Sequence, residues 1–107
     1  MTIVVPMTKE AEIKDNEYYS VIQEPAVDEA AAITDRAISL PHALNCLTIL
    51  ELPSGINVTL KFNGTGNDSV PIIEGDKIKD MSIRTLHYST TGGLTANTIK
   101  MYGEWRV

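Results

Sequence analysis

Nucleophilic catalysis is the first chemistry to consider, because the chain has one cysteine and two histidines. A thiol becomes a nucleophile when a base lies within hydrogen-bonding reach of it. His42 and Cys46 are four residues apart, but Pro41 argues against one helical face that carries both. His87 lies much further along the chain, next to Tyr88. No known nucleophile motif is present. The sequence therefore predicts structural histidines, a buried and inert thiol, and a protein that is not an enzyme.

A loop rich in glycine and asparagine, residues 63–69, is the next candidate site. A phosphate-binding loop needs a lysine and a following helix, and a calcium loop needs several carboxylates. This loop has only Asp68 and leads into an expected strand. Two distant histidines are also a weak metal signal. We therefore predict a hairpin loop, with no metal site, no cofactor and no cofactor-binding residue.

Three aromatic residues, Tyr88, Tyr102 and Trp105, could form a platform that stacks on sugars or bases. Tyr102 and Trp105 have opposite parity in an expected strand, so they would share a face only if the strand were bulged. Packing in the core and on the sheet face is the better interpretation. Binding to single-stranded nucleic acid would also need a positive groove beside the aromatics.

The charge of the chain bears on its partners. With nine basic and fourteen acidic residues, the net charge is −5, which disfavours binding to nucleic acid and to anionic lipid. The densest basic cluster, Lys77, Lys79 and Arg84, is interleaved with acidic residues and is typical of a mixed, solvated surface. The start, residues 1–6, lacks the features of a signal peptide. No apolar run approaches the roughly 20 residues that span a bilayer. We expect a cytoplasmic protein without a membrane partner.

Alternation of apolar and polar residues is the main structural signal. Residues 55–63 alternate without error, which predicts a strand with Ile56, Val58, Leu60 and Phe62 facing a core. Further strands are expected at residues 18–23, 34–40, 44–52, 70–73, 78–88 and 98–107, with a turn-rich loop at residues 89–93. The apolar phase slips between Ile83 and Leu86, which indicates a β-bulge or burial on both faces.

These elements predict a mainly β fold, an antiparallel β-sandwich or small β-barrel with at most one short helix. At 107 residues the chain is one domain, with residues 18–107 as the β domain and residues 1–17 as an arm or edge strand. The segment 26–38 combines helix signals with later alternation. It predicts a short helix or turn through Ala30–Ala32, then a strand. A helix there would fit the alternative of an Sm-like small barrel, which forms rings and binds RNA, although the negative charge argues against RNA.

The order of strands and loops from Leu47 onward carries a family resemblance. Its parts are two strands, a loop, a Val-Pro-Ile and Glu-Gly-Asp pair, and two further strands, at residues 48–52, 58–63, 66–69, 70–76, 87–90 and 98–101. Over about the last sixty residues this order resembles that of small virion structural proteins of tailed bacteriophages. The alanines at 30–32 and the glycines at 92–93 depart from it, so the N-terminal half is not assigned.

The resemblance implies a non-enzymatic structural protein in a capsid, neck or tail, with no catalytic residue to carry over. The expected partners are further copies of the chain, as a homo-oligomer, and other virion proteins. Such a protein would be made in the cytoplasm of a bacterial host and then enter the virion. Its acidic charge and strong edge strands agree with an assembling protein.

Overall fold

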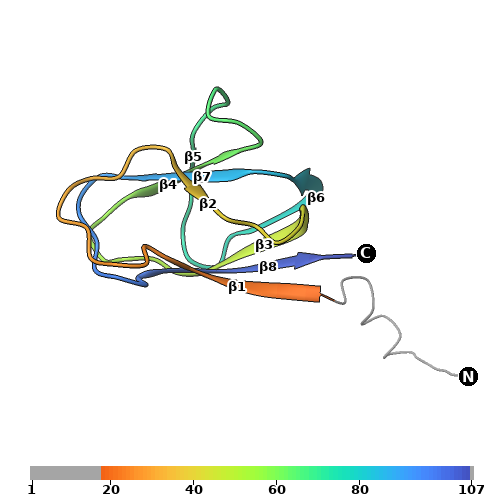
Figure 1. The fold of residues 1–107 in the computed structure, drawn as a ribbon, viewed down its shortest axis with the longest axis horizontal. Helices are drawn as coiled ribbons and strands as arrows, with labels where there is room; N and C mark the ends of the chain where they lie inside the picture. Colours follow the sequence, from red (N-terminus) through yellow and green to blue (C-terminus); the bar gives the residue numbers. More distant parts are fainter. Residues whose placement is uncertain (1–17, 107) are drawn as a thin grey trace, which may run out of the picture.

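The computed structural model describes residues 18–106, which form eight β-strands and no helix (Figure 1). The predicted mainly β fold is confirmed. The predicted arm at residues 1–17 lies outside the described residues, as does Val107. The strands are β1 (Tyr18–Glu24), β2 (Arg36–Ile38), β3 (Leu44–Glu51), β4 (Val58–Phe62), β5 (Val70–Pro71), β6 (Lys77–Ile83), β7 (Leu86–Thr90) and β8 (Ile99–Trp105).

The strands pair as if one long hairpin had been rolled up. β1 pairs with β8, β2 with β7, β3 with β6 and β4 with β5, all antiparallel. Two further pairings, β3 with β8 and β4 with β7, join the halves of the roll. The result is two sheets, which we call sheet 1 (β1-β8-β3-β6) and sheet 2 (β2-β7-β4-β5). They form the two layers of a sandwich (Figure 1), with the winding of a double-sheet jelly roll.

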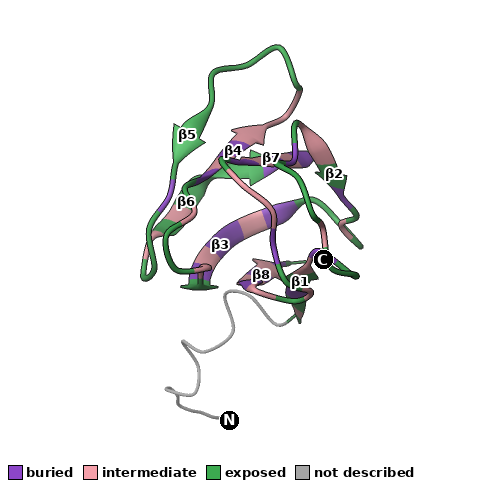
Figure 2. Ribbon diagram, turned by 90° about the vertical axis from the view of Figure 1, so that its left-hand side faces the viewer, coloured by how far each residue is buried: buried purple, intermediate pink, exposed green. Residues whose placement is uncertain are grey.

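Side-chain parity builds the core between the two sheets. In β8, Ile99, Met101 and Trp105 are buried while Lys100 and the other alternate residues are partly exposed, as the sequence predicts. In β4, Val58 and Leu60 are buried. Figure 2 shows this banding along β3, where buried and partly buried residues follow each other. Full burial of such an aliphatic side chain stabilises the fold by about 1.5–3 kcal/mol.

The segment with helix signals forms no helix. Ala30, Ala31 and Ala32 are exposed in the connection between β1 and β2. Alanines give a helix little apolar area to bury. The backbone just before them pairs instead with the connection between β7 and β8. Glu29 and Leu94 exchange two hydrogen bonds of 2.8 and 2.9 Å between their N–H and carbonyl groups. The following strand is confirmed as β2, although it is shorter than the expected 34–40, whereas the helix and the Sm-like alternative that needed it are wrong.

The expected single strand over residues 78–88 is also wrong. The chain instead leaves sheet 1 at Ile83 and enters sheet 2 at Leu86, and both side chains are fully buried. The slip in apolar phase therefore marks a corner at Arg84 and Thr85 rather than a bulge. β7 also continues through Ser89 and Thr90, which the sequence placed in a loop. β5 is shorter than expected, and ends at Pro71.

Asn63, which directly follows β4 in sheet 2, holds this corner in place. Its Oδ1 accepts hydrogen bonds from the N–H groups of Arg84 at 2.6 Å and Thr85 at 3.3 Å. Its Nδ2 donates to the carbonyl oxygen of Ser82 at 2.9 Å, and its own N–H donates to the carbonyl of Thr85. Asn63 has a φ of 63°, a left-handed conformation that asparagine adopts more readily than most residues. One side chain thus satisfies the backbone where the chain changes sheets.

Candidate functional site

The structure keeps the two histidines and the cysteine apart. His42 stacks on the ring of Trp105 at 5.2 Å, on the core side of β8. Cys46 lies opposite Glu104 in the β3–β8 register. Because neighbouring residues of a strand point to opposite faces, Cys46 and His42 lie on different sides of sheet 1. His87 belongs to the other sheet, so no histidine stands beside the thiol.

His87 lies on the outer face of sheet 2, where its cross-strand neighbours are Ala37 and Lys61. Next to it, Ser89 and Asp35 hydrogen-bond to each other. The Asp35 N–H donates to Ser89 Oγ at 2.9 Å, and Ser89 Oγ donates to Asp35 Oδ1 at 3.3 Å. Catalysis by a serine would need the hydroxyl against the histidine and the carboxylate behind it. Here the carboxylate holds the hydroxyl, so the three residues do not form that arrangement.

Lys61 on the same face also bonds to its neighbours, whereas the buried Nδ1 of His87 has no hydrogen-bond partner. Lys61 Nζ lies 3.2 Å from Asp35 Oδ2 and donates to the carbonyl oxygen of Thr65 at 3.0 Å. The Lys61 side chain is only 21% exposed, which fits a cation held in place on the sheet. Polar side chains that satisfy each other on a sheet face leave few groups to recognise a ligand. The outer face of sheet 2 therefore has the properties of a solvated surface.

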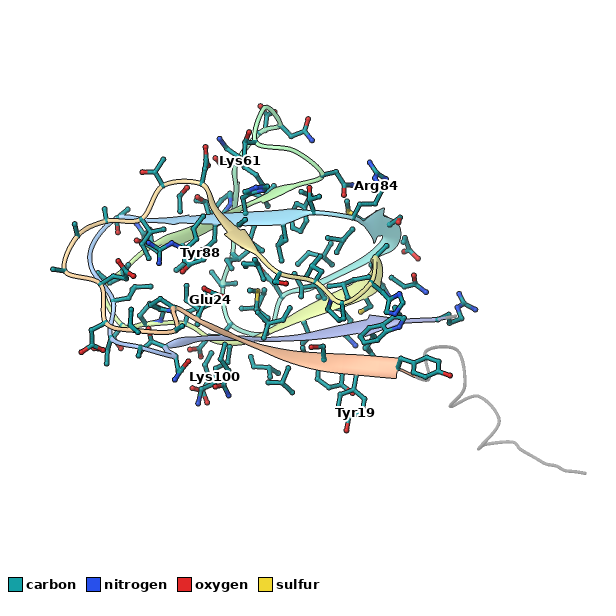
Figure 3. All side chains as sticks on the ribbon, viewed as in Figure 1. Tyr19, Glu24, Lys61, Arg84, Tyr88 and Lys100 are labelled. Carbon is teal, nitrogen blue, oxygen red and sulfur yellow. The ribbon has the colours of Figure 1, made fainter. Side chains whose placement is uncertain are left out.

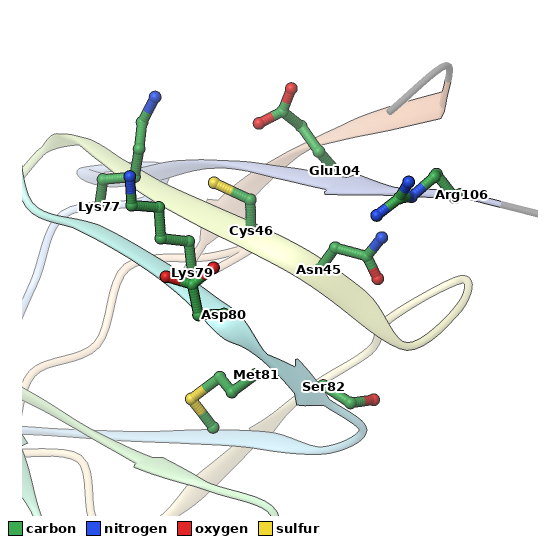
Figure 4. Close-up of a pocket in the computed structure, with 9 residues that line it drawn as sticks. All are labelled: Asn45, Cys46, Lys77, Lys79, Asp80, Met81, Ser82, Glu104 and Arg106. Atoms are coloured by element: carbon green, nitrogen blue, oxygen red, sulfur yellow. The ribbon is translucent and has the colours of Figure 1, made fainter. Parts of the chain in front are cut away.

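A groove on the outer face of sheet 1 surrounds Cys46 (Figure 4). It has a volume of about 630 Å³ and runs across β3, β6 and β8. Burial, with the nearby Glu104 carboxylate as a further cause, raises the pKa of the Cys46 thiol. A raised pKa keeps the sulfur protonated, and the thiol is a poor nucleophile and metal ligand. The predicted buried location of Cys46 is confirmed.

The charges along this groove are mixed in sign. Lys77, Lys79 and Arg106 line it together with Asp80 and Glu104 (Figure 4). Arg84, which the sequence grouped with the two lysines, lies instead at the corner between the sheets. The basic cluster is therefore divided and accompanied by carboxylates. This arrangement lacks the continuous positive surface that a nucleic-acid backbone requires.

The three aromatic residues of the predicted platform do not share a surface. Tyr88 and Trp105 are buried in the core, and only Tyr102 points outward. The parity argument is therefore confirmed. Tyr88 instead joins the two sheets, since its hydroxyl donates to Glu24 Oε1 of β1 at 3.2 Å (Figure 3). Burial and the Glu24 charge raise the pKa of Tyr88 to about 12.

The aromatic residue that does join Tyr102 is Tyr19, which the sequence placed in a strand without a functional role. The two rings stack at 5.3 Å on the outer face of sheet 1. Val21 lies directly opposite Tyr102 in the β1–β8 register. Tyr19 is 62% exposed and Val21 is 53% exposed, and Tyr19 projects away from the sandwich (Figure 3). We call Tyr19, Val21 and Tyr102 the β1 outer patch. The sequence held one signal for it, the shared parity of Tyr19 and Val21.

Residues 18–106 contain no cluster of three metal-ligating side chains and no helix that is long and apolar enough to cross a membrane. Comparisons of the chain with models of protein families, with curated proteins and with solved structures give no match. The surface with the clearest functional character is therefore the β1 outer patch, judged by its own geometry.

Proposed function

We propose that this protein is a non-enzymatic structural subunit that self-associates, as a component of a bacteriophage virion in its capsid, neck or tail. Its partners would be further copies of the chain and other virion proteins. It would be made in the host cytoplasm before it enters the particle.

The observation that carries the proposal is the β1 outer patch. Apolar side chains that are scattered singly over a surface need no explanation, but neighbouring ones mark contact surfaces. Tyr19 and Val21 are more than half exposed, lie on one strand and share Tyr102 as a neighbour. Tyrosine is enriched at protein interfaces because it offers a large, stiff contact area with a polar end. Contact with another protein would remove this area from water.

The winding of the fold supports the same proposal. Double-sheet jelly rolls serve as viral capsid domains, and also as lectins and cupins. A fold by itself does not choose among these functions. The choice rests on the β1 outer patch together with the order of strands and loops in the last sixty residues, which resembles that of small phage virion proteins. The acidic net charge of −5 favours protein partners over nucleic acid.

Light scattering of the purified protein tests self-association, and electron micrographs of the same sample test for assembled particles. We expect a mass above the subunit mass of 11.7 kDa at micromolar to millimolar concentration, and discrete oligomers in the micrographs. A strict monomer over that range would contradict the proposal. Binding to single-stranded RNA at low salt that disappears at high salt would instead favour a ring-forming RNA-binding protein.

A further inference from the structure

The four outer edges of the two sheets differ in how well they are protected. An unpaired strand edge offers free N–H and carbonyl groups to another chain, and proteins block this with short strands, proline, charges or irregular backbone. In sheet 2, β2 has three residues, and β5 has two and ends with Pro71. In sheet 1, β6 carries Lys77, Lys79 and Asp80, and Asp80 has a left-handed φ of 66°. Three edges are therefore protected.

The fourth edge, β1, has none of these features. It runs for seven residues, all seven in unbroken register with β8. It contains no lysine, arginine, proline or glycine, and Glu24 at its end is its only charged residue. Its other edge pairs with no strand among residues 18–106. The β1 outer patch lies beside this edge, so a strand added there would also cover apolar side chains.

We propose that the free edge of β1 pairs with β1 of a second copy, antiparallel about a two-fold axis. This inference rests on the proposed self-association and names its contact. Directly opposed residues point to the same face, so the two outer patches would lie together on one side of a continuous eight-stranded sheet. A second copy fits this edge because two identical strands that run antiparallel can pair along their full length.

The charge on β1 sets the register. When Val21 of one copy lies opposite Val21 of the other, all seven residues find a partner. Tyr19 then faces Gln23, and Glu24 faces Tyr18. The two Glu24 carboxylates lie at opposite ends of the paired strands, where their repulsion is weakest. If the two-fold axis moved from Val21 toward Glu24, the two carboxylates would come closer together and fewer residues of the two strands would be paired. Self-pairing of β6 in the register that pairs all seven of its residues would instead set Asp80 opposite Asp80, which is unfavourable.

A matched pair of substitutions tests the contact. Val21→Lys places two ammonium groups at the proposed axis, and Val27→Lys makes the same change at a 64% exposed site outside the strand. Both side chains are exposed in the subunit, so both variants should fold, which circular dichroism verifies. By sedimentation equilibrium we expect wild type and Val27→Lys to form dimers of twice 11.7 kDa. Val21→Lys should dimerise about tenfold more weakly or worse, because it loses an apolar pair and gains a like-charge pair.

A disulfide tests the register. Opposed residues in an antiparallel pair have Cα atoms about 4.5–5.5 Å apart, within the range that a disulfide spans. In a Cys46→Ala background, Val21→Cys should form a covalent dimer under a mild oxidant, whereas Val27→Cys should not. Failure of Val21→Cys to cross-link would overturn this pairing. Val21→Lys that dimerises like wild type would overturn the β1 contact but leave self-association standing. A monomeric wild type would overturn both.

Discussion

Gly93 offers the sharpest test of the packing between the β7–β8 connection and the β1–β2 connection, through the substitution Gly93→Ala. A Cβ at this position would lie 2.5 Å from the carbonyl oxygen of Glu29 and 2.8 Å from the carbonyl carbon and oxygen of Ala30. Real Cβ atoms do not approach this closely, and backbone atoms cannot rotate away as a side chain can. The bridge between Glu29 and Leu94 must therefore open.

Opening the bridge has a cost that follows from its contacts. Two backbone hydrogen bonds of 2.8 and 2.9 Å join Glu29 and Leu94, and each contributes about 0.5–1.5 kcal/mol. Leu94 is buried, and part of its burial energy of about 1.5–3 kcal/mol would be lost as well. We expect Gly93→Ala to lower the free energy of unfolding by about 2–4 kcal/mol. For a small domain this lowers Tm by about 10–30 °C.

Two other glycines serve as controls for this experiment. Gly103→Ala would place a Cβ 2.8 Å from Leu44 Cδ1, a side-chain atom, but Leu44 is fully buried and can yield little. We expect a loss of about 1–2 kcal/mol there. Gly66→Ala meets no atom within 4 Å and has no positive φ, so its stability should stay within about 0.5 kcal/mol of wild type or rise slightly.

Denaturation by urea, followed by fluorescence of Trp105, measures all three variants. Trp105 is the only tryptophan, is buried, and stacks on Tyr18 and His42, so unfolding changes its surroundings. All samples are compared at one protein concentration, because self-association would add to apparent stability. The reasoning fails if Gly93→Ala matches wild type, or if Gly66→Ala is destabilised as much as Gly93→Ala.

Three further predictions concern single side chains. Asn63→Ala removes the groups that bind the backbone at the corner between the sheets, and should cost about 2–4 kcal/mol in urea denaturation; Asn63→Asp keeps the acceptor and should cost less, so equal losses would contradict this role. Tyr88→Phe removes the hydrogen bond to Glu24 and should cost about 1–2 kcal/mol at neutral pH. Because the folded state raises the pKa of Tyr88 to about 12, the stabilisation by its bound proton is complete below pH 10 and is lost as the pH rises to 12. Wild type should therefore lose up to about 2–3 kcal/mol over that interval and Tyr88→Phe less, and parallel curves would refute the pKa shift. Cys46 should react with a thiol reagent at least about tenfold more slowly in the native protein than in urea, and equal rates would show that the thiol is accessible.

The sequence predicts the strands better than it predicts their arrangement, because side-chain parity is a local property. Alternation in residues 99–105 identifies which side chains of β8 face the core. Both sheets bury one face, however, so parity does not say which sheet a strand joins. The slip between Ile83 and Leu86 fits either a bulge in one strand or a corner between two. The corner depends on Asn63, whose partners lie about twenty positions away.

The β1 outer patch could not be predicted from the sequence for a related reason. Tyr19 and Val21 are visible in the sequence as residues of one strand face. Their exposure, however, depends on β1 lying at the edge of sheet 1, which is a matter of topology. Likewise, Ala30–Ala32 form no helix although the sequence favours one. The neighbouring Glu29 pairs with Leu94, a residue far away in the sequence. Contacts of this kind become visible only in the folded chain.

The rolled-hairpin winding also imposes an order of events during synthesis. β8 is the one described strand that pairs with β1, and nearly all of the described chain lies between them. At about 5–20 residues per second, a ribosome needs roughly 4–15 seconds to make the residues between the two strands. During that time both edges of β1 are open, with Tyr19 and Val21 beside them. A nascent chain of this fold therefore has to keep β1 away from neighbouring chains until β8 emerges, although pairing between finished subunits uses the same strand.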